Sequence, residues 1–306
     1  MKKLSYSVSP HSSAGGSTSN VMLCVILALL PAAVTGVINY GEQALILLGV
    51  TTATAMLSEA LIRILLRKPQ TVGDLSAAVT GMLLGMSLPP ACPVLWAAAG
   101  SAFAVIIVKQ LFGGIGKNFA NPALTAKVLL LLLLRQEMYM WILPQAGTPM
   151  NANASLWDMF LGNTVGCIGE TCTVGLLLGG VFLCLTGIIP LVTPAAFFGS
   201  FALLTWLGGY EILPQMMTGG LLLCAFFMAT DYTTTPLTRR GKLLFGIGCG
   251  CVTYLIRHYG GYTEDACLAV LVMNLAVPLL DKLTAAKPFG AVPQPKKSRK
   301  DTAISV

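Results

Sequence analysis

Three acidic residues interrupt the long apolar runs of this sequence and are therefore candidates for handling a cation. Glu59, Asp74 and Asp231 lie within such runs or at their ends. A carboxylate in an apolar, membrane-like environment is costly and is by default a functional candidate. Asp74 and Asp231 are thus candidates for an ion pathway, although each also stands where it could cap a helix. Glu59 could simply pair with Arg63, one helical turn later.

The largest polar interruption of the apolar pattern is the stretch 142–170, which contains Gly147-Thr148-Pro149. A glycine and a proline on either side of a threonine are typical of a turn in an exposed loop. A threonine nucleophile needs an adjacent base, and no His or Lys neighbours Thr148. The residues alone therefore indicate only a structural role for this turn.

Cysteines and glycine-rich stretches offer little further chemistry. The nine cysteines include no CxxC pair, and most lie in apolar runs, so we expect no metal site or cysteine-ligated cluster within this chain. The stretch 113–123 lacks the Lys and Ser/Thr spacing of a phosphate-binding loop. Its Asn121-Pro122 pair predicts the start of a helix. The glycines of 246–250 lie inside an apolar segment and are typical of close helix packing.

The elements that must position these residues are membrane segments. Of 306 residues, 55% are hydrophobic and only 10% are charged, against about 25% charged in soluble domains. A spanning helix needs about 20 largely apolar residues. The hydropathy pattern predicts segments at 21–38, 43–66, 74–88, 93–111, 122–141, 171–189, 191–208, 215–230, 242–257 and 264–281.

The basic residues predict the orientation of these segments. If the N-terminus is cytoplasmic and every segment crosses, all Lys and Arg except Arg135 and Arg257 fall toward the cytoplasm. Cytoplasmic loops of membrane proteins carry such an excess of positive charge. The net charge of +7 therefore reflects orientation in a lipid membrane, and we expect no nucleic-acid partner.

The third segment of each half of the chain is short. Segment 74–88 stops at Pro89-Pro90, and segment 215–230 stops at Asp231. The ten predicted segments divide into two sets of five. Because five is an odd number, the second set enters the membrane from the opposite side, as in transporters built from inverted repeats. The predicted parts are a cytoplasmic tail (1–20), a first five-helix repeat (21–141), an extracytoplasmic loop (142–170), a second five-helix repeat (171–281) and a basic cytoplasmic tail (282–306).

Four stretches together resemble a known family. They are KQLFGGIGKNFANPA (109–123), GCIGET (166–171), LLLCAFFMATDYTTTP (221–236) and YLIRHYGGYTEDACLAVLVMNLAVPLLD (254–281). These strings are similar to D subunits of the Rnf electron-transport complex and, less closely, to B subunits of the sodium-pumping NADH:quinone oxidoreductase. The similarity extends over about residues 5 to 285. It implies an all-α integral membrane protein of about ten transmembrane helices in two inverted repeats, similar to urea transporters.

The resemblance also implies a covalent flavin. In the family, a separate flavin transferase attaches FMN by a phosphodiester to a threonine in an external Ser-Gly-Ala-Thr motif. The matching residue is Thr148, although this sequence reads Gln145-Ala146-Gly147-Thr148. Thr171 or Thr173, or no covalent flavin, are the alternatives. A second, noncovalent flavin (riboflavin) is expected by analogy, and Arg257, on the predicted outer side, is a candidate contact for a flavin phosphate.

The function implied by the resemblance is electron transfer coupled to ion movement. The chain would be one component of an Rnf-type ferredoxin:NAD oxidoreductase that moves Na+ or H+ across a prokaryotic cell membrane, with the A, B, C, E and G subunits as partners. It would carry electrons and would not be catalytic on its own. The residues alone also suit a stand-alone permease or channel, or a passive assembly scaffold.

Substitution of the two ion-pathway candidates tests this hypothesis. In Asp74→Asn or Asp231→Asn complexes, we expect fewer ions to be moved per electron, because a neutral amide binds a cation more weakly than a carboxylate. Ion uptake into membrane vesicles, measured beside electron transfer, gives this ratio. Normal pumping by both variants would remove Asp74 and Asp231 from the pathway.

Overall fold

The computed structural model describes residues 17–114, 116, 118–138, 155–260 and 265–285. Within these residues, all regular structure is helical. The predicted all-α class is therefore confirmed for the described part of the chain. Thr148 and most of both predicted tails lie outside the described residues.

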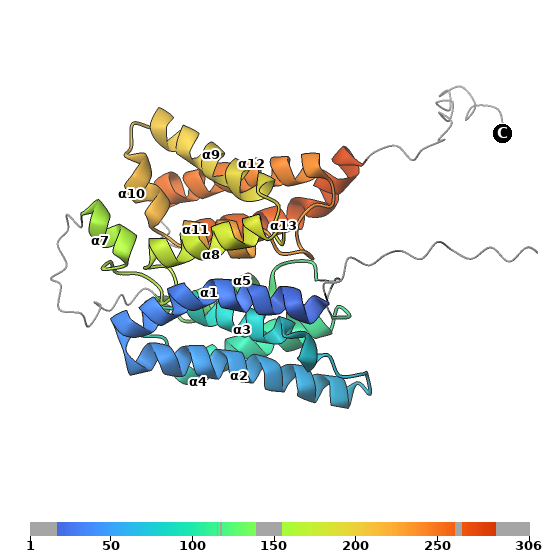
Figure 1. Cartoon of the computed structure of the whole chain (residues 1–306). Coiled ribbons are helices and arrows are strands. Elements are labelled where there is room, and N and C mark those ends of the chain that lie inside the picture. Colours follow the sequence, from blue (N-terminus) through green and yellow to red (C-terminus); the bar gives the residue numbers. More distant parts are fainter. Residues whose placement is uncertain (1–16, 115, 117, 139–154, 261–264, 286–306) are drawn as a thin grey trace, which may run out of the picture.

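The first half of the chain forms helices of unequal length, drawn in blue to green in Figure 1. Two long helices come first, and shorter pieces follow. These elements are α1 (Thr18–Tyr40), α2 (Glu42–Leu65), the 3-10 turn η1 (Val72–Asp74), α3 (Ser76–Met86), α4 (Val94–Phe103), the π-helical η2 (Ala104–Gln110), α5 (Pro122–Leu133) and α6 (Arg135–Met138).

The second half contains two further π-helical stretches. Each continues directly from an α-helix. The helix therefore runs on without a break, but the wider π-helical turn rotates the side chains that follow onto a different face. The elements are α7 (Leu156–Leu161), α8 (Thr173–Leu185), α9 (Val192–Leu207), α10 (Ile212–Met217), α11 (Leu221–Leu223), η3 (Cys224–Met228), α12 (Arg239–Leu255), η4 (Ile256–Gly260) and α13 (Asp265–Thr284).

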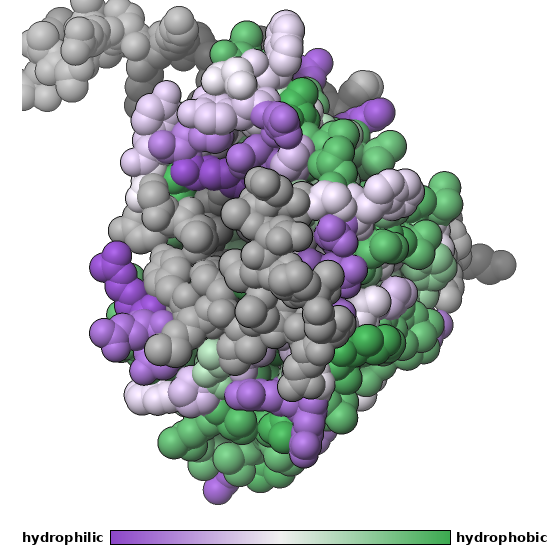
Figure 2. All heavy atoms as spheres, turned by 90° about the vertical axis from the view of Figure 1, so that its left-hand side faces the viewer, coloured by the Kyte–Doolittle hydropathy of each residue, from purple (hydrophilic) through white to green (hydrophobic). Residues whose placement is uncertain are grey.

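Membrane character is visible in helix length and on the surface. Three described helices, Thr18–Tyr40, Glu42–Leu65 and Ala266–Thr284, are long and apolar enough to cross a membrane by themselves. Leucines such as Leu57 and Leu185 are largely exposed along the sides of the molecule. Figure 2 views the end that carries α7 and α10, and hydrophobic residues cover its right flank and its base. Apolar surface of this extent is typical of contact with lipid.

Local sequence explains how the shorter helices begin. Asn121 caps α5: its side-chain oxygen accepts from the backbone N–H groups of Ala123 and Leu124, as the Asn-Pro pair predicted. The helix α3 follows Leu75, which adopts a left-handed backbone conformation with φ of 62°. This conformation interrupts the helical path, so the third segment is a short helix after a turn.

The two halves meet along α1 and α8, which lie side by side in Figure 1. Two glycines of α8 allow this approach. A Cβ atom at Gly179 would overlap the carbonyl oxygen of Ala28, and one at Gly175 would lie 2.9 Å from the backbone nitrogen of Ala32. Small residues at a membrane helix interface let backbones come close. The helices α5 and α13 also contact each other across this junction.

Some predicted segment ends were wrong. In the segment predicted at 122–141, the helix α5 ends at Leu133, and the short helix α6 begins at Arg135. The segment predicted at 215–230 contains the end of α10, a break at Gly219-Gly220 and then α11 with η3. A hydropathy window averages over such breaks, because the residues on both sides of each break are apolar.

The glycine contact between α8 and α1 can be tested directly. We expect Gly179→Ala to destabilise the protein by about 1–3 kcal/mol, the usual cost of overpacking a well-packed interface. Gly49→Ala is the matched control, because a Cβ there meets nothing within 4 Å and alanine favours a helix. Thermal unfolding of the purified protein in detergent should show a lower midpoint for Gly179→Ala alone; equal midpoints would contradict the packing argument.

Candidate functional site

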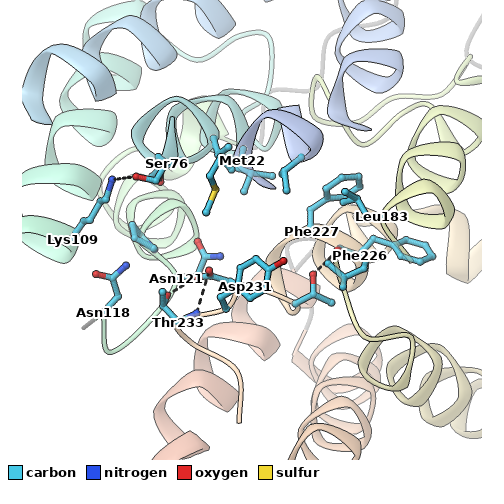
Figure 3. A pocket seen from close by; sticks show the side chains of 18 residues that line it. Met22, Ser76, Lys109, Asn118, Asn121, Leu183, Phe226, Phe227, Asp231 and Thr233 are labelled. Atoms are coloured by element: carbon cyan, nitrogen blue, oxygen red, sulfur yellow. Dashed lines mark hydrogen bonds between the residues drawn. The ribbon is translucent and has the colours of Figure 1, made fainter. Parts of the chain in front are cut away.

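A cavity lies at the junction of the two halves, near the Thr18 end of α1 (Figure 3). The volume that the centre of a water molecule can reach is about 80 Å³, which leaves room for several waters. Its wall contains residues from both halves of the chain: Met22, Val25, Ser76, Val79, Thr80, Leu83, Lys109, Asn118, Asn121, Pro122, Leu183, Ile189, Phe226, Phe227, Thr230, Asp231, Tyr232 and Thr233.

The wall of this cavity has a polar and an apolar side. Ser76, Lys109 and Asn118 lie on one side in Figure 3, and Phe226 and Phe227 lie on the other. The side-chain oxygen of Asn118 is buried without a hydrogen-bond partner among the described residues. A buried acceptor of this kind is costly unless a ligand or water supplies the donor. The cavity therefore suits a partly aromatic ligand that carries hydrogen-bond donors.

Lys109 and Ser76, on the polar side of the cavity, also belong to a buried network of charges. The Lys109 ammonium lies 3.1 Å from Glu59 and donates to the Ser76 hydroxyl at 2.6 Å. Gln110 and Thr71 also donate to the Glu59 carboxylate, at 2.6 and 2.8 Å. The Lys109 and Glu59 side chains are 2% and 0% exposed, so burial is tolerated only because the charges are paired and hydrogen-bonded.

One expectation about these charges was wrong. Glu59 does not pair with Arg63, because the Arg63 guanidinium donates to the carbonyl oxygen of Pro69 while Glu59 faces Lys109. Lys109 and Lys127, which the charge count placed toward the cytoplasm, are both buried in ion pairs, and the predicted orientation itself stays a prediction. The partner of each charge depends on which way its helix faces and on which helix lies next to it. A count of charges along the chain contains neither kind of information.

The two acidic candidates for an ion pathway occupy similar local structures. The Asp74 carboxylate accepts from the backbone N–H and hydroxyl of Ser76, which places it at the start of α3. The Asp231 carboxylate accepts from the N–H and hydroxyl of Thr233. Asp231 lines the cavity, whereas Asp74 reaches Lys109 only through the hydroxyl of Ser76. Their predicted role in ion movement stays a prediction.

A second buried ion pair lies toward the Tyr40 end of α1. The Lys127 ammonium is 3.0 Å from the Glu170 carboxylate and 3.9 Å from the sulfur of Cys167. The two charged side chains are 1% and 5% exposed. Gly220, with φ of 66°, makes room for the carboxylate, since a Cβ there would lie 2.5 Å from a Glu170 oxygen. This pair was not foreseen from the sequence; its signal was a lone Lys in an apolar run.

Arg257 lies at the same end of the molecule and binds the C-terminal end of α10. Its guanidinium donates to the carbonyl oxygens of Gln215 and Thr218 and lies 5.0 Å above the ring of Phe201. Its predicted contact with a flavin phosphate stays a prediction, because Thr148 lies outside the described residues.

The other threonines considered for flavin attachment are buried. Thr171 is 3% exposed and Thr173 is 1% exposed. The Thr173 hydroxyl also donates to the carbonyl oxygen of Met159. A transferase must reach the hydroxyl that it modifies, so the folded structure disfavours both residues.

We expect the loss of one charge of the Lys109–Glu59 pair to destabilise the protein more than the loss of both charges. Lys109→Met leaves the buried Glu59 charge without its partner, which costs about 3–5 kcal/mol. The double variant Lys109→Met/Glu59→Gln removes both charges and should recover most of this loss. Thermal unfolding in detergent measures the difference. A single variant as stable as the wild type would show that the pair contributes nothing to folding.

Known proteins are similar to this chain over nearly its whole length. The chain is 40% identical to the D subunit of the Na(+)-translocating ferredoxin:NAD(+) oxidoreductase complex of Acetobacterium woodii, over 97% of this chain and 98% of the relative. It is 38% identical to the D subunit of the proton-translocating ferredoxin:NAD(+) oxidoreductase complex of Clostridium ljungdahlii, over 93% and 95%. Residues 5–290 match the family described as NQR2, RnfD, RnfE. The chain therefore belongs to the NQR2, RnfD, RnfE family.

Proposed function

We propose that this chain is the D-type membrane subunit of an Rnf-type, ion-translocating ferredoxin:NAD oxidoreductase complex in a prokaryotic cell membrane. The observation that carries the proposal is similarity over the full length of a relative with that name. The chain acts with the A, B, C, E and G subunits as partners and is not catalytic alone. Within the complex it carries electrons and binds neither ferredoxin nor NAD.

In this proposal, Thr148 holds FMN through a phosphodiester bond made by a separate flavin transferase. The burial of Thr171 and Thr173 supports the choice, because it disfavours the two alternative attachment sites. The bound flavin supplies one-electron chemistry to the complex. The protein positions the flavin, sets its surroundings and excludes water. The predicted orientation places the Thr148 loop outside the membrane and both termini in the cytoplasm.

The cavity between the halves is the proposed site of the second, noncovalent flavin, riboflavin. The wall offers the residue types that such a ring contacts, and the surrounding helices must separate to admit the ring, because the present space holds only several waters. The unpartnered oxygen of Asn118 can accept a hydrogen bond from a ring N–H, and the cavity-lining Lys109 can donate to a ring carbonyl. Phe226 and Phe227 supply an apolar wall.

We also propose that the helices form two inverted five-helix repeats with ten membrane crossings, as in urea transporters. Three features support this arrangement. The first helices of the halves, α1 and α8, pack on each other. The third helix of each half follows a left-handed residue, Leu75 or Gly220. The fourth helix of each half ends in a π-helical stretch, η2 or η4.

Electron transfer in the complex would drive the movement of Na+ or H+. Moving one charge across the membrane costs about 2.3 kcal/mol per 100 mV, so the protein must couple the two events. Asp231 at the cavity and Asp74 beside the Lys109 network are the proposed ion-pathway carboxylates. Their positions at the ends of broken helices support this role, because small changes there alter access to the cavity.

Flavin fluorescence tests the proposed function directly. The denatured chain, taken from cells that contain the flavin transferase, should give a fluorescent band on a gel, because a phosphodiester survives denaturation. The band should vanish in Thr148→Ala and persist in Thr171→Ala, the matched control. A dark wild-type band would favour the permease or scaffold alternatives, and a fluorescent Thr148→Ala band would place the flavin elsewhere.

A further inference from the structure

A second cavity lies where the helices α9 and α12 begin. The volume that the centre of a water molecule can reach there is about 400 Å³, so this space is larger than the one in Figure 3. Its wall comes from the links 187–190 and 230–237 and from Thr193 and Lys242 on the two helices. The Tyr232 hydroxyl joins the links, because it donates to the carbonyl oxygen of Ile188 at 2.6 Å.

The helices α9 and α12 are parallel, so both present their N-terminal ends to this cavity. A Cβ atom at Gly246 would meet Thr193, and one at Gly250, a turn later, would meet Phe201. Residue numbers therefore rise in the same direction along both helices, which lie side by side in Figure 1. The N-terminal end of a helix carries a partial positive charge and favours a bound anion.

The C-terminal end of α8 borders the same cavity and opposes this effect only weakly. Its last carbonyl groups are already used, because Cys184 and Leu183 accept from the N–H groups of Gly187 and Ile188. Partial charges that are satisfied within the turn contribute little to a ligand.

Basic side chains add to the positive charge at the start of α12. Its first turn contains Arg239, Arg240 and Lys242 and no acidic residue. Cations at the positive end of a helix dipole destabilise the helix. Among the described residues, none of the three forms an ion pair, and the one carboxylate that bonds this link, Asp281, accepts from the N–H of Leu237. An anion in the cavity would offset this repulsion.

A buried hydroxyl in the wall also calls for a ligand. The Thr193 side chain is 0% exposed, and its hydroxyl has no hydrogen-bond partner among the described residues. The other threonine hydroxyls of the wall, on Thr230 and Thr235, donate to the carbonyl oxygens of Phe226 and Asp231. A buried polar group without a partner is costly, and a hydroxyl can donate to an anion oxygen.

The surroundings of the cavity indicate what kind of anion it takes. Leu237, in its wall, is 84% exposed, and Leu191, directly before α9, is 63% exposed. Apolar surface beside a basic pocket suits a molecule that has both an anionic head and hydrocarbon chains. The predicted orientation puts the start of α12 at the cytoplasmic surface, where basic pockets between membrane helices bind anionic lipid head groups.

We propose that this cavity binds a phosphate group, which Thr193 and Lys242 contact and which Arg239 and Arg240 attract. The exposed leucines favour the phosphate of an anionic phospholipid, and free phosphate offers the same chemistry without the chains. The site needs no flavin and no electron transfer, so it goes beyond the proposed function and can be tested separately from it.

Lipid-dependent stability tests the site. The full chain, purified in neutral detergent and stripped of lipid, is titrated with dioleoyl phosphatidylglycerol while its thermal unfolding is measured. We expect the midpoint to rise, because a ligand that binds the folded state stabilises it. Dioleoyl phosphatidylcholine has the same chains but no net charge and should require at least tenfold more lipid for the same rise.

Inorganic phosphate distinguishes the two sources. If the site belongs to a lipid, phosphate should give less than a tenth of the affinity of phosphatidylglycerol. A rise of equal size at equal concentration would assign the site to a soluble phosphate. No rise with either anion, or an equal rise with both lipids, would overturn the proposal.

Two variants connect the effect to the cavity. Thr193→Val keeps the shape of the side chain and removes a hydroxyl that has no partner. Without lipid it should therefore unfold at or above the wild-type midpoint, yet bind phosphatidylglycerol at least threefold more weakly. Thr205→Val is the matched control, because Thr205 is equally buried on the same helix but donates to Phe201. This control should lower the midpoint and leave the lipid affinity unchanged.

Lys242→Gln removes the charge that lines the cavity and should weaken phosphatidylglycerol binding at least fivefold. Lys242 is partly exposed, so its variant should fold. Lys68→Gln, at an exposed lysine outside the cavity, should retain wild-type affinity. Wild-type affinity in both Thr193→Val and Lys242→Gln would overturn the site, and an equal loss in Lys68→Gln would show only general attraction to a charged surface.

Discussion

Pairing of buried charges is the constraint on which the rest of this structure depends. In a protein surrounded by lipid, an ammonium or carboxylate cannot be left without a partner of opposite charge. Lys109 meets Glu59, and Lys127 meets Glu170, each at about 3 Å. Each contact joins elements that are more than forty residues apart in the chain. Each also lies beside a left-handed residue: Lys109 donates to Ser76 directly after Leu75, and a Cβ at Gly220 would lie 2.5 Å from a Glu170 oxygen.

Close packing at the junction of the halves makes the cavity possible. The glycines of α8 bring it against α1 with no side chains between the backbones. Ser76 of α3 and Phe226 of η3 line opposite sides of the space that remains beside this contact. Both halves supply polar residues to the cavity, such as Ser76 and Asp231, whereas the phenylalanines Phe226 and Phe227 come from the second half. Neither half by itself contains the site, and this explains why the cavity lies at the interface of two proposed repeats.

Much of the fold and part of the site follow from local sequence. Long apolar runs specify helices in lipid, because backbone groups must bond within the segment. Asn121-Pro122 specifies the start of α5, because the amide oxygen satisfies free N–H groups. Breaks such as Leu75 were located only approximately, since leucine carries no signal for a left-handed conformation. Asp74 and Asp231 were visible as isolated acids, and both proved to bond residues two positions later, which is a local pattern.

The sequence by itself therefore determined the membrane class, the approximate helix positions, the family and the threonine proposed to carry FMN. Only the tertiary structure decided which charges are paired, that Thr171 and Thr173 are buried, and that Lys109 borders a cavity between the two halves. The physical reason is the range of the interactions. Hydropathy and capping act within a few residues, whereas Lys127 reaches Glu170 only after two halves of the chain have packed through Gly175 and Gly179.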